Sequence, residues 1–340
     1  MSRSAAPRTG QLRPVQISSL ATHVPPKVLT NVQLEQMVET SDDWIVKRTG
    51  IRERHIVDPG VATSDLGAVA AAQALEEAGL TPDDLQLIVV GTTTPDTIFP
   101  STACRIQAKI GASKAWGFDL GAACSGFTYA MTAAAQMVAT GAHDHALVVG
   151  ADVMSSIIDY TDRTTCVLFG DGAGAVVLGP ADDAHLSIID FVHEIDGSGG
   201  DALCMPAGGS LKPATRDTVE QRLHYVHQDG QAVFRFAVRK TEEICRRLLG
   251  RNGLEPDQID LFVSHQANRR IVTSAANRLG LAPCKVVINI ERYGNTTAGT
   301  VPLALADARA QGRLKRGDLV LLASVGAGFT AGAVLLRWAL

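Results

Sequence analysis

Apolar residues in this chain fall into short continuous runs, separated by longer segments in which apolar positions recur with helical spacing. A continuous run of this length is typical of a strand that is buried on both faces of a sheet. The runs predict strands over 85–91, 116–120, 145–151, 173–179, 260–265, 286–291, 319–324 and 332–338. The segments between them predict helices over 64–78, 101–110, 124–140, 232–251, 267–279 and 296–311. Strands that alternate with helices indicate an α/β fold with mixed sheets covered by helices.

The order of these elements occurs twice. Residues 78–90 (AGLTPDDLQLIVV) resemble residues 252–264 (NGLEPDQIDLFVS), which begin 174 positions later, and both pass from a glycine through a proline into a strand. Downstream, AGAVVL at 173–178 resembles AGAVLL at 331–336. We therefore expect one α/β unit written twice and stacked as α-β-α-β-α layers. A site is expected where the two halves meet.

We expect an N-terminal tail at 1–13, a first half at 14–181 and a second half at 182–340. The only candidate membrane segment, 319–336, is 18 residues without a charge, which reaches the lower limit for a spanning helix. Three glycines divide it, so two buried strands joined by a turn are the better interpretation, and no membrane span is expected.

Composition and charge narrow the classes of function. With 46% hydrophobic and 19% charged residues, the 340-residue chain can close a sizeable core. The net charge of −4 argues against nucleic-acid binding, and any anionic partner needs a local basic patch. The six cysteines contain no C-x-x-C pair, so neither a zinc nor a redox motif is expected. We expect most of them to be free thiols in a reducing compartment.

Three polar residues stand at predicted sheet ends. Cys124 follows a strand and begins an apolar helix, where unpaired N–H groups and the helix dipole favour a thiolate, and hence a nucleophile. His265 ends the strand that repeats 85–91, and Asn295 lies near the position that corresponds to Cys124 in the second half. Taken singly, Cys124 is equally well explained as a small core residue, His265 as a hydrogen-bonded core histidine and Asn295 as a helix N-cap. Their joint placement favours a shared site.

A family resemblance supports that interpretation. CSGF at 124–127 is joined by other motifs in characteristic order and spacing: TSDDWIVKRTGIRERH at 40–55, DRTTCVLFGDGAGA at 162–175, SHQANRRI at 264–271, RYGNTTAGTVPLAL at 292–305 and GAGFTAGAVLLRW at 326–338. From about residue 14 to residue 338 the chain resembles beta-ketoacyl-ACP synthase III, the initiating condensing enzyme of bacterial type II fatty acid biosynthesis. The resemblance implies the thiolase-like fold, with two mixed five-stranded sheets.

The resemblance also implies a mechanism. Cys124 would accept an acyl group, acetyl or another short chain, from acyl-CoA, and His265 with Asn295 would stabilise the enolate formed when malonyl-ACP loses carbon dioxide. The products would be 3-ketoacyl-ACP, CoA and CO2. The backbone N–H groups of Cys124 and Ala327 would bind the oxyanion. Acyl-CoA is then a substrate, and neither a cofactor nor a metal is expected.

Binding residues are implied in the same way. For CoA they are Trp44 and Arg163 beside the adenine, Arg48 near the phosphates, and Asn268 and Gln231 on the pantetheine. For the acidic acyl carrier protein they are Arg235, Arg239, Arg269, Arg270 and Arg278. Each of these residues is also readable as an ordinary solvated surface residue.

Phe99 and Val325 are expected at the acyl pocket, with Phe99 supplied by the other subunit of a homodimer. Many family members have Phe where this chain has Val325, and Asn where it has Gln231. These departures leave the primer open. A relative in secondary metabolism, which transfers the acyl group elsewhere or condenses without a carrier protein, is the alternative function; a binding-only pseudo-synthase is a third, disfavoured by the intact Cys124. The expected compartment is the cytoplasm.

Overall fold

The first sheet is built from the first half of the chain. The computed structural model describes residues 12–340, and in it five strands follow the order β1-β7-β6-β4-β5. Their bounds are Val15–His23 (β1), Leu87–Gly91 (β4), Trp116–Leu120 (β5), Ala146–Val153 (β6) and Asp171–Pro180 (β7). Strands β4, β5 and β6 are parallel, and β7 is antiparallel to both β6 and β1. The sheet is therefore mixed, as predicted.

The second sheet repeats this arrangement in the order β8-β13-β12-β11. Its strands are Ile188–Ile195 (β8), Leu261–Ser264 (β11), Leu319–Gly326 (β12) and Thr330–Arg337 (β13). The register repeats too: Leu87 pairs with Ala146 in the first sheet, and Leu261 pairs with Val320 in the second, each 174 positions later. The duplicated order of elements is therefore confirmed.

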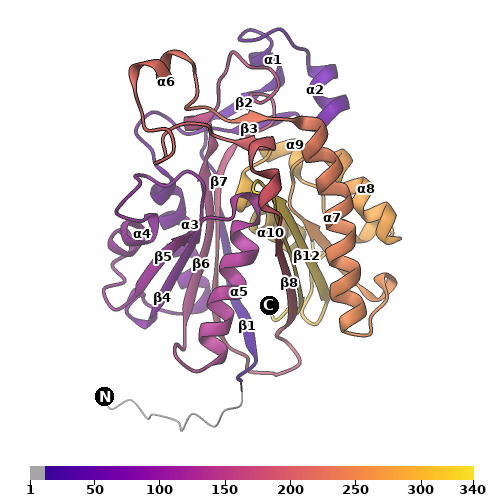
Figure 1. Cartoon of the computed structure of the whole chain (residues 1–340). Coiled ribbons are helices and arrows are strands. Elements are labelled where there is room, and N and C mark those ends of the chain that lie inside the picture. The colour runs from indigo at the N-terminus through magenta and orange to yellow at the C-terminus, as the bar shows by residue number, and fades with distance from the viewer. Residues whose placement is uncertain (1–11) are drawn as a thin grey trace.

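Five layers result, as Figure 1 shows. Helices α5 (Gly126–Ala139) and α10 (Thr300–Ala310) lie between the sheets, in one continuous core with the inward side chains of both. Helices α3 (Thr63–Ala78) and α4 (Thr102–Ile110) cover the outer face of the first sheet. Helices α7 (Gly230–Arg251) and α8 (Arg269–Leu279) cover that of the second. The predicted α-β-α-β-α architecture is confirmed.

The remaining short elements include a set gathered at one end of the layers, at the top of Figure 1. They are β2 (Val28–Thr30), α1 (Asn31–Leu34), α2 (Asp42–Thr49), β3 (Glu53–His55), α6 (Arg216–Glu220) and α9 (Ile290–Tyr293), together with the small pair β9 (Leu203–Cys204) and β10 (His227–Gln228). Within residues 12–340 no helix is long and apolar enough to cross a membrane. Segment 319–336 forms strands β12 and β13, as predicted.

One detail of the prediction is wrong. The strand expected at 286–291 forms a single bridge, between Val286 and Phe262, and its end enters α9, so the second sheet has four strands. The buried side chain of Gln266 takes the place of the missing pairing, because its amide donates to the carbonyl of Val287 and accepts from the N–H of Asn289. Arg13, assigned to the tail, bonds through its N–H to Ala139 and through its guanidinium to Asp144 at 2.9 Å; residues 1–11 of that tail lie outside the described part.

Candidate active site

Cys124 lies in a tight turn between β5 and α5. The turn is a 3₁₀ segment, Ala123–Ser125, and Ala123 within it has a φ of +48°. Close backbone packing places this turn: a Cβ at Gly91, the last residue of β4, would lie 2.4 Å from the carbonyl carbon of Gly126. Glycine at Gly91 thus lets the first turn of α5 rest on the end of the sheet. The helix predicted to begin at Cys124 begins two residues later, at Gly126, as α5.

The prediction of a thiolate at Cys124 is wrong for the resting site. Burial raises the pKa of this thiol to about 12, and the nearby carboxylate of Asp152 acts in the same direction. Both effects disfavour an anionic sulfur, and they act against the helix N-terminus that favours it. The resting residue is a neutral thiol, so acylation requires that its proton leave during the attack.

His265 follows β11 directly and is buried. Its backbone N–H donates to the carbonyl of Ala323 at 2.7 Å, which extends the pairing with β12 by one residue. Its ring Nδ1 lies 2.6 Å from the hydroxyl of Thr300, at the start of α10. Burial lowers the pKa of His265 to about 3, so the ring is neutral at physiological pH. A neutral imidazole can donate one hydrogen bond without carrying charge into the cavity.

Asn295 is fixed through both its backbone and its side chain. The N–H donates to Leu168 at 2.8 Å, and the carbonyl accepts from Gly170 at 3.1 Å. The side-chain Oδ1 accepts from the N–H of Thr297 at 2.9 Å, so the amide orientation is set and the NH2 group is left to donate elsewhere. Asn295 is not the N-cap of the following helix, since that position is Thr296 for the 3₁₀ turn and Gly299 for α10, but its side chain still bonds to the turn.

One partly open cavity brings the three residues together. Cys124, His265 and Asn295 all line it, and so does Val325 from β12. Gly326 keeps space beside the nucleophile, because a Cβ there would lie 2.8 Å from the backbone nitrogen of Cys124. A second cavity, with mostly apolar walls, also includes Cys124 and contains the other predicted oxyanion residue, Ala327.

A wider pocket leads from the first cavity toward the surface. Both pockets include Asn268 and Phe234 in their walls, and the outer one also includes Arg48 and Gln231, two of the residues predicted to bind CoA. Asn268 caps α8 and also donates to the carbonyl of Arg48 at 3.1 Å, which ties α8 to the end of α2. The predicted pantetheine residues thus lie between the surface and Cys124.

The residues predicted to flank the adenine also lie together. The guanidinium groups of Arg48 and Arg163 lie 5.5 and 5.3 Å from the ring centroid of Trp44, which is half-buried on α2. The N-cap Ser41 begins α2 by accepting from the N–H of Trp44 at 3.2 Å. Aromatic and guanidinium planes next to each other form a surface on which a purine can stack.

The predicted carrier-protein residues divide into two groups. Arg235 and Arg270 line the outer pocket, and Arg270 lies over the ring of Phe234 at 5.5 Å. Arg269 and Arg278 are instead in ion pairs, with Glu291 at 3.8 Å and Glu242 at 3.3 Å. Arg239 is exposed on α7. Of the predicted carrier-protein residues, those at the outer pocket are therefore one on α7 and one on α8, beside Arg48 on α2.

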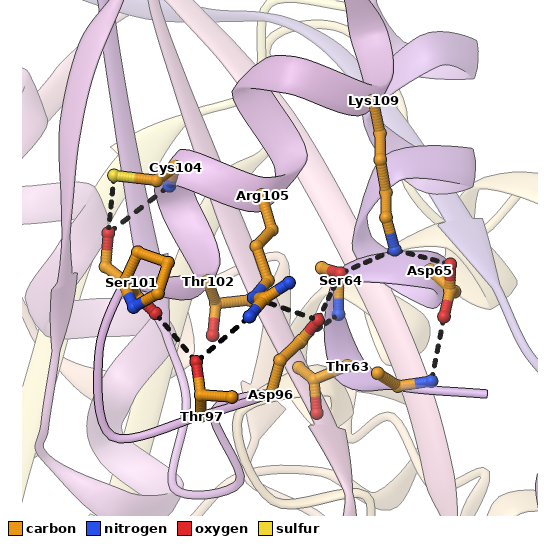
Figure 2. Close-up of polar contacts among 12 residues, drawn as sticks. Thr63, Ser64, Asp65, Asp96, Thr97, Ser101, Thr102, Cys104, Arg105 and Lys109 are labelled. Atoms are coloured by element: carbon orange, nitrogen blue, oxygen red, sulfur yellow. Dashed lines mark hydrogen bonds and ion pairs between the residues drawn. The ribbon is translucent and has the colours of Figure 1, made fainter. Parts of the chain in front are cut away.

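Phe99 does not line any of these cavities within the described chain. It is 83% exposed, beside Ile98 at 84%, on the loop between β4 and α4. Figure 2 shows the polar contacts at the base of this loop: Asp96 accepts from the hydroxyl of Ser64 at 2.6 Å and faces Arg105 at 3.7 Å. Such a firmly held loop presents its aromatic tip outward, so the role of Phe99 in a pocket stays a prediction that needs a second copy of the chain.

Three residues of the site were not predicted: Asp152, Thr297 and Thr300. One signal was present, since Asp152 is a charged residue inside an otherwise apolar strand, ALVVGADV. The two threonines gave no signal, because their contacts join segments far apart in the sequence. The six cysteines are free, as expected.

Comparison with known proteins gives consistent matches along the chain. Residues 118–197 match the family model "3-Oxoacyl-[acyl-carrier-protein (ACP)] synthase III", and residues 249–338 match the model of its C-terminal part. The chain is 58% identical to the beta-ketoacyl-[acyl-carrier-protein] synthase III of Solibacter usitatus, over 95% of this chain and 98% of that protein. For Koribacter versatilis the identity is 54%, over 96% and 99%. The crystal structure of the 3-oxoacyl-[acyl-carrier-protein] synthase III of Aquifex aeolicus is similar with a TM-score of 0.88 and 41% identity, covering 95% of this chain and 100% of that one.

Proposed function

The chain belongs to the 3-oxoacyl-[acyl-carrier-protein] synthase III family and is an initiating condensing enzyme of fatty acid biosynthesis, and we propose that it works through Cys124, His265 and Asn295. The observation that carries the assignment is the one cavity lined by all three residues, which adjoins a basic outer pocket. The reaction takes an acyl group from acyl-CoA and condenses it with malonyl-ACP. Its products are 3-ketoacyl-ACP, CoA and CO2.

In the first half-reaction the sulfur of Cys124 attacks the thioester carbon of acyl-CoA as its own proton leaves. The carbonyl oxygen becomes an oxyanion, which accepts from the backbone N–H groups of Cys124 and Ala327. Gly326 supports this role, because any side chain there would crowd the Cys124 nitrogen. The carbon–sulfur bond to CoA then breaks, and CoA leaves as a thiol with the proton that Cys124 lost.

In the second half-reaction the malonyl thioester loses CO2, and the electron pair of the broken bond forms an enolate. Neutral His265 and the NH2 group of Asn295 donate to the enolate oxygen. The lowered pKa of His265 suits this task, since a cation there would bind the malonyl carboxylate and hold back its loss. The enolate carbon attacks the acyl-Cys124 carbonyl, and the sulfur leaves and regains a proton.

The surrounding residues supply the binding. CoA lies along the outer pocket, with its adenine near Trp44 and Arg163, its phosphates near Arg48 and its pantetheine arm past Asn268 and Gln231. Acyl carrier protein docks on the basic residues of α7 and α8, first Arg235 and Arg270 at the entrance, then Arg239, Arg269 and Arg278. CoA is substrate, and the reaction as written needs no cofactor.

The mostly apolar second cavity receives the primer, which we propose to be acetyl or another short acyl group. Phe99 closes that cavity from a second copy of the chain, so the working form is a homodimer. Residues 14–181 and 182–340 are two halves of one catalytic unit, and neither works alone. Six free cysteines fit a reducing compartment such as the cytoplasm.

The test follows both half-reactions in one preparation. The protein is incubated with acyl-CoA, from acetyl-CoA to decanoyl-CoA, and Cys124 acylation is read by intact mass. Malonyl-ACP carrying a labelled carboxyl group is then added, and released CO2 and 3-ketoacyl-ACP are measured. We expect acylation by the short primers and one CO2 per product. Acyl-enzyme that forms and yields no CO2 would rule out the condensation.

A further inference from the structure

Asp152 is a buried carboxylate that the proposed reaction leaves without a role. It lies near the end of β6 and is 0% exposed. The partners of its carboxylate are N–H and O–H donors from two segments, the loop at 92–94 after β4 and the turn at 297–298 before α10. These segments belong to opposite halves of the chain. Asp152 therefore joins the halves directly below the cavity.

The two carboxylate oxygens accept hydrogen bonds from different halves of the chain. Oδ1 accepts from the backbone N–H groups of Thr93 at 2.7 Å and Thr94 at 3.1 Å, and from the hydroxyls of residues 92–94 at 2.9 to 3.0 Å. Oδ2 accepts from the hydroxyl of Thr297 and from the N–H of Ala298 at 3.2 Å. One oxygen thus serves the first half and the other serves the second.

Thr297 connects Asp152 to Asn295. Its φ of +48° is unfavourable for a β-branched residue, and such backbone strain persists where the surroundings enforce it. In this conformation its N–H donates to Oδ1 of Asn295 while its hydroxyl donates to Asp152. The strained residue therefore holds the amide of Asn295 by one bond and is itself held by the other.

We propose that Asp152 and Thr297 are a positioning pair that fixes the Asn295 amide with its NH2 group toward the cavity and so controls the condensation step. This inference rests on the donor role proposed for Asn295. Neither member needs to touch substrate. Their effect on condensation reaches the reaction through one oriented amide. Acylation of Cys124 does not need that amide, and loss of the Asp152 charge, which raises the pKa of the Cys124 thiol, would favour acylation and not slow it.

Asp152→Asn tests this with little change of shape. An asparagine amide has one oxygen, and two rigid N–H groups need it on the side of Oδ1. The NH2 group then replaces Oδ2 and faces the N–H of Ala298, so the conflict falls on the turn that carries Thr297 and Asn295. Thr297→Val removes the hydroxyl and keeps the shape, whereas Thr297→Ser keeps the hydroxyl.

Asp171→Asn is the matched control. Asp171 is also 0% exposed and accepts only N–H and O–H donors, but these belong to Ser155 and Val57 and not to the turn at 297–298. For every variant we measure the rate of Cys124 acylation, the kcat and KM for malonyl-ACP, and the Tm. Acylation and condensation are thereby separated from stability.

We expect Asp152→Asn and Thr297→Val to lower the kcat of condensation by about 10²-fold, with KM within about 3-fold of the wild type and acylation slowed by no more than about 3-fold. Acylation in Asp152→Asn should if anything be faster, because the charge that raises the pKa of Cys124 is gone. Thr297→Ser and Asp171→Asn should stay within about 3-fold in every rate. In an Asn295→Ala background, Asp152→Asn should cause no further loss, because the amide it positions is gone.

Other outcomes overturn the inference. Equal losses of acylation and condensation would mean that Asp152 is only structural, as would a full further loss in the Asn295→Ala background. If Asp152→Asn does not fold, Thr297→Val and Thr297→Ser decide alone, and equal activity in these two variants refutes the pair. Condensation that survives in Asn295→Ala refutes instead the proposed role of Asn295, which keeps the two failures distinct.

Discussion

The two turns, or junctions, that lead into the central helices α5 and α10 share a backbone conformation but differ in chemistry. Each contains a non-glycine residue with a φ of +48°, Ala123 in the first and Thr297 in the second, 174 positions apart. Each then forms a 3₁₀ turn, 123–125 or 297–299, and enters a central helix. At this offset Cys124 corresponds to Ala298, and Gly121 corresponds to Asn295. The duplicated unit thus supplies two matching positions for catalytic groups, and each half uses only one.

The supports of the two junctions differ in the same systematic way. Gly91 and Gly126 touch through their backbones in the first half, whereas the corresponding His265 and Thr300 meet through a hydrogen bond of 2.6 Å in the second. Asp152 bonds to the N–H of Ala298, whereas the corresponding Gly326 leaves the N–H of Cys124 accessible. The first junction keeps space for an attacked carbonyl, and the second fills that space with fixed donors and acceptors.

The largest expected effect comes from making the first junction like the second. Cys124→Ala places alanine where Ala298 stands in the other half, and we expect no acyl-enzyme at all, because no other thiol lines the first cavity among the described residues. Intact mass after incubation with acetyl-CoA measures this. Cys245→Ala is the control, since that thiol is buried in the outer layer; any acylation left in Cys124→Ala would mean a different nucleophile.

The converse change removes the donor of the second junction. Asn295→Ala makes this position small, like Gly121, and we expect condensation to fall by about 10² to 10³-fold, the usual cost of one lost oxyanion donor. Acylation should persist, because its oxyanion is bound at the first junction. Released CO2 and acyl-Cys124 are measured in parallel. An equal decline of both would contradict the proposal that the two half-reactions use different hydrogen-bond donors.

A smaller effect is expected at Gly326, which corresponds to Asp152. In Gly326→Ala the new Cβ would lie 2.8 Å from the nitrogen of Cys124 and 2.9 Å from the hydroxyl of Thr330, so something must move. We expect acylation to slow by about 10-fold to 10²-fold and the free energy of unfolding to fall by about 1–3 kcal/mol. Stopped-flow acylation and urea unfolding measure the two effects. Gly250→Ala, on exposed α7 surface with open space at the Cβ, is the control.

The strands were predictable to the extent that both faces of them are buried. In β4, Leu87 and Val89 face the central core while Ile88 and Val90 face the outer layer, which produces a continuous apolar run. Strands β1 and β8 were missed because polar residues are mixed into their apolar pattern, such as Asp190 in β8, whereas the edge strand β5 was predicted although it is only partly buried. The periodicity of apolar residues reports burial, so a strand that includes polar residues is harder to predict from the sequence.

Some features of the site were likewise predictable from the sequence and others were not. Cys124, His265 and Asn295 were predictable because a repeat and a set of family motifs place them at sheet ends. The pKa of Cys124 was not, because it depends on burial and on Asp152, and neither is visible in the local sequence. The lost strand at 286–291 has the same cause, since one side chain, Gln266, took over its hydrogen bonds. The local sequence does not indicate which atoms from distant segments come into contact in the folded chain.

Acid should weaken the second half more than the first. Burial lowers the pKa of His265 to about 3 and that of His193, on β8, to about 4, whereas the position that corresponds to His265 in the first half is Gly91. Below pH ~6.5 the unfolded chain binds protons that the folded chain excludes, so stability is complete above that pH and falls as the pH drops toward these values. Each histidine contributes a slope of about 1.4 kcal/mol per pH unit.

Urea unfolding between about pH 7.5 and 5 measures that slope. His193→Gln should reduce it, since glutamine can replace the hydrogen bond of the ring to the hydroxyl of Thr132 and does not titrate. A slope that is the same in His193→Gln and in the wild type would show that the acid sensitivity arises elsewhere in the chain.

The smallest expected effect is the sharpest test of the comparison. Ala298→Cys, made in the Cys124→Ala protein, puts a thiol at the matching turn of the second half, and we expect no acylation there. The backbone N–H of residue 298 is already bonded to Asp152, and Ala298 is 0% exposed. A thiol in this place has neither a free oxyanion donor nor room for a thioester. Acylation of the introduced thiol, read by intact mass and peptide mapping, would mean that the junction backbone alone makes a nucleophile. Its absence would mean that Gly326 and the space it leaves beside Cys124 are as necessary as the sulfur.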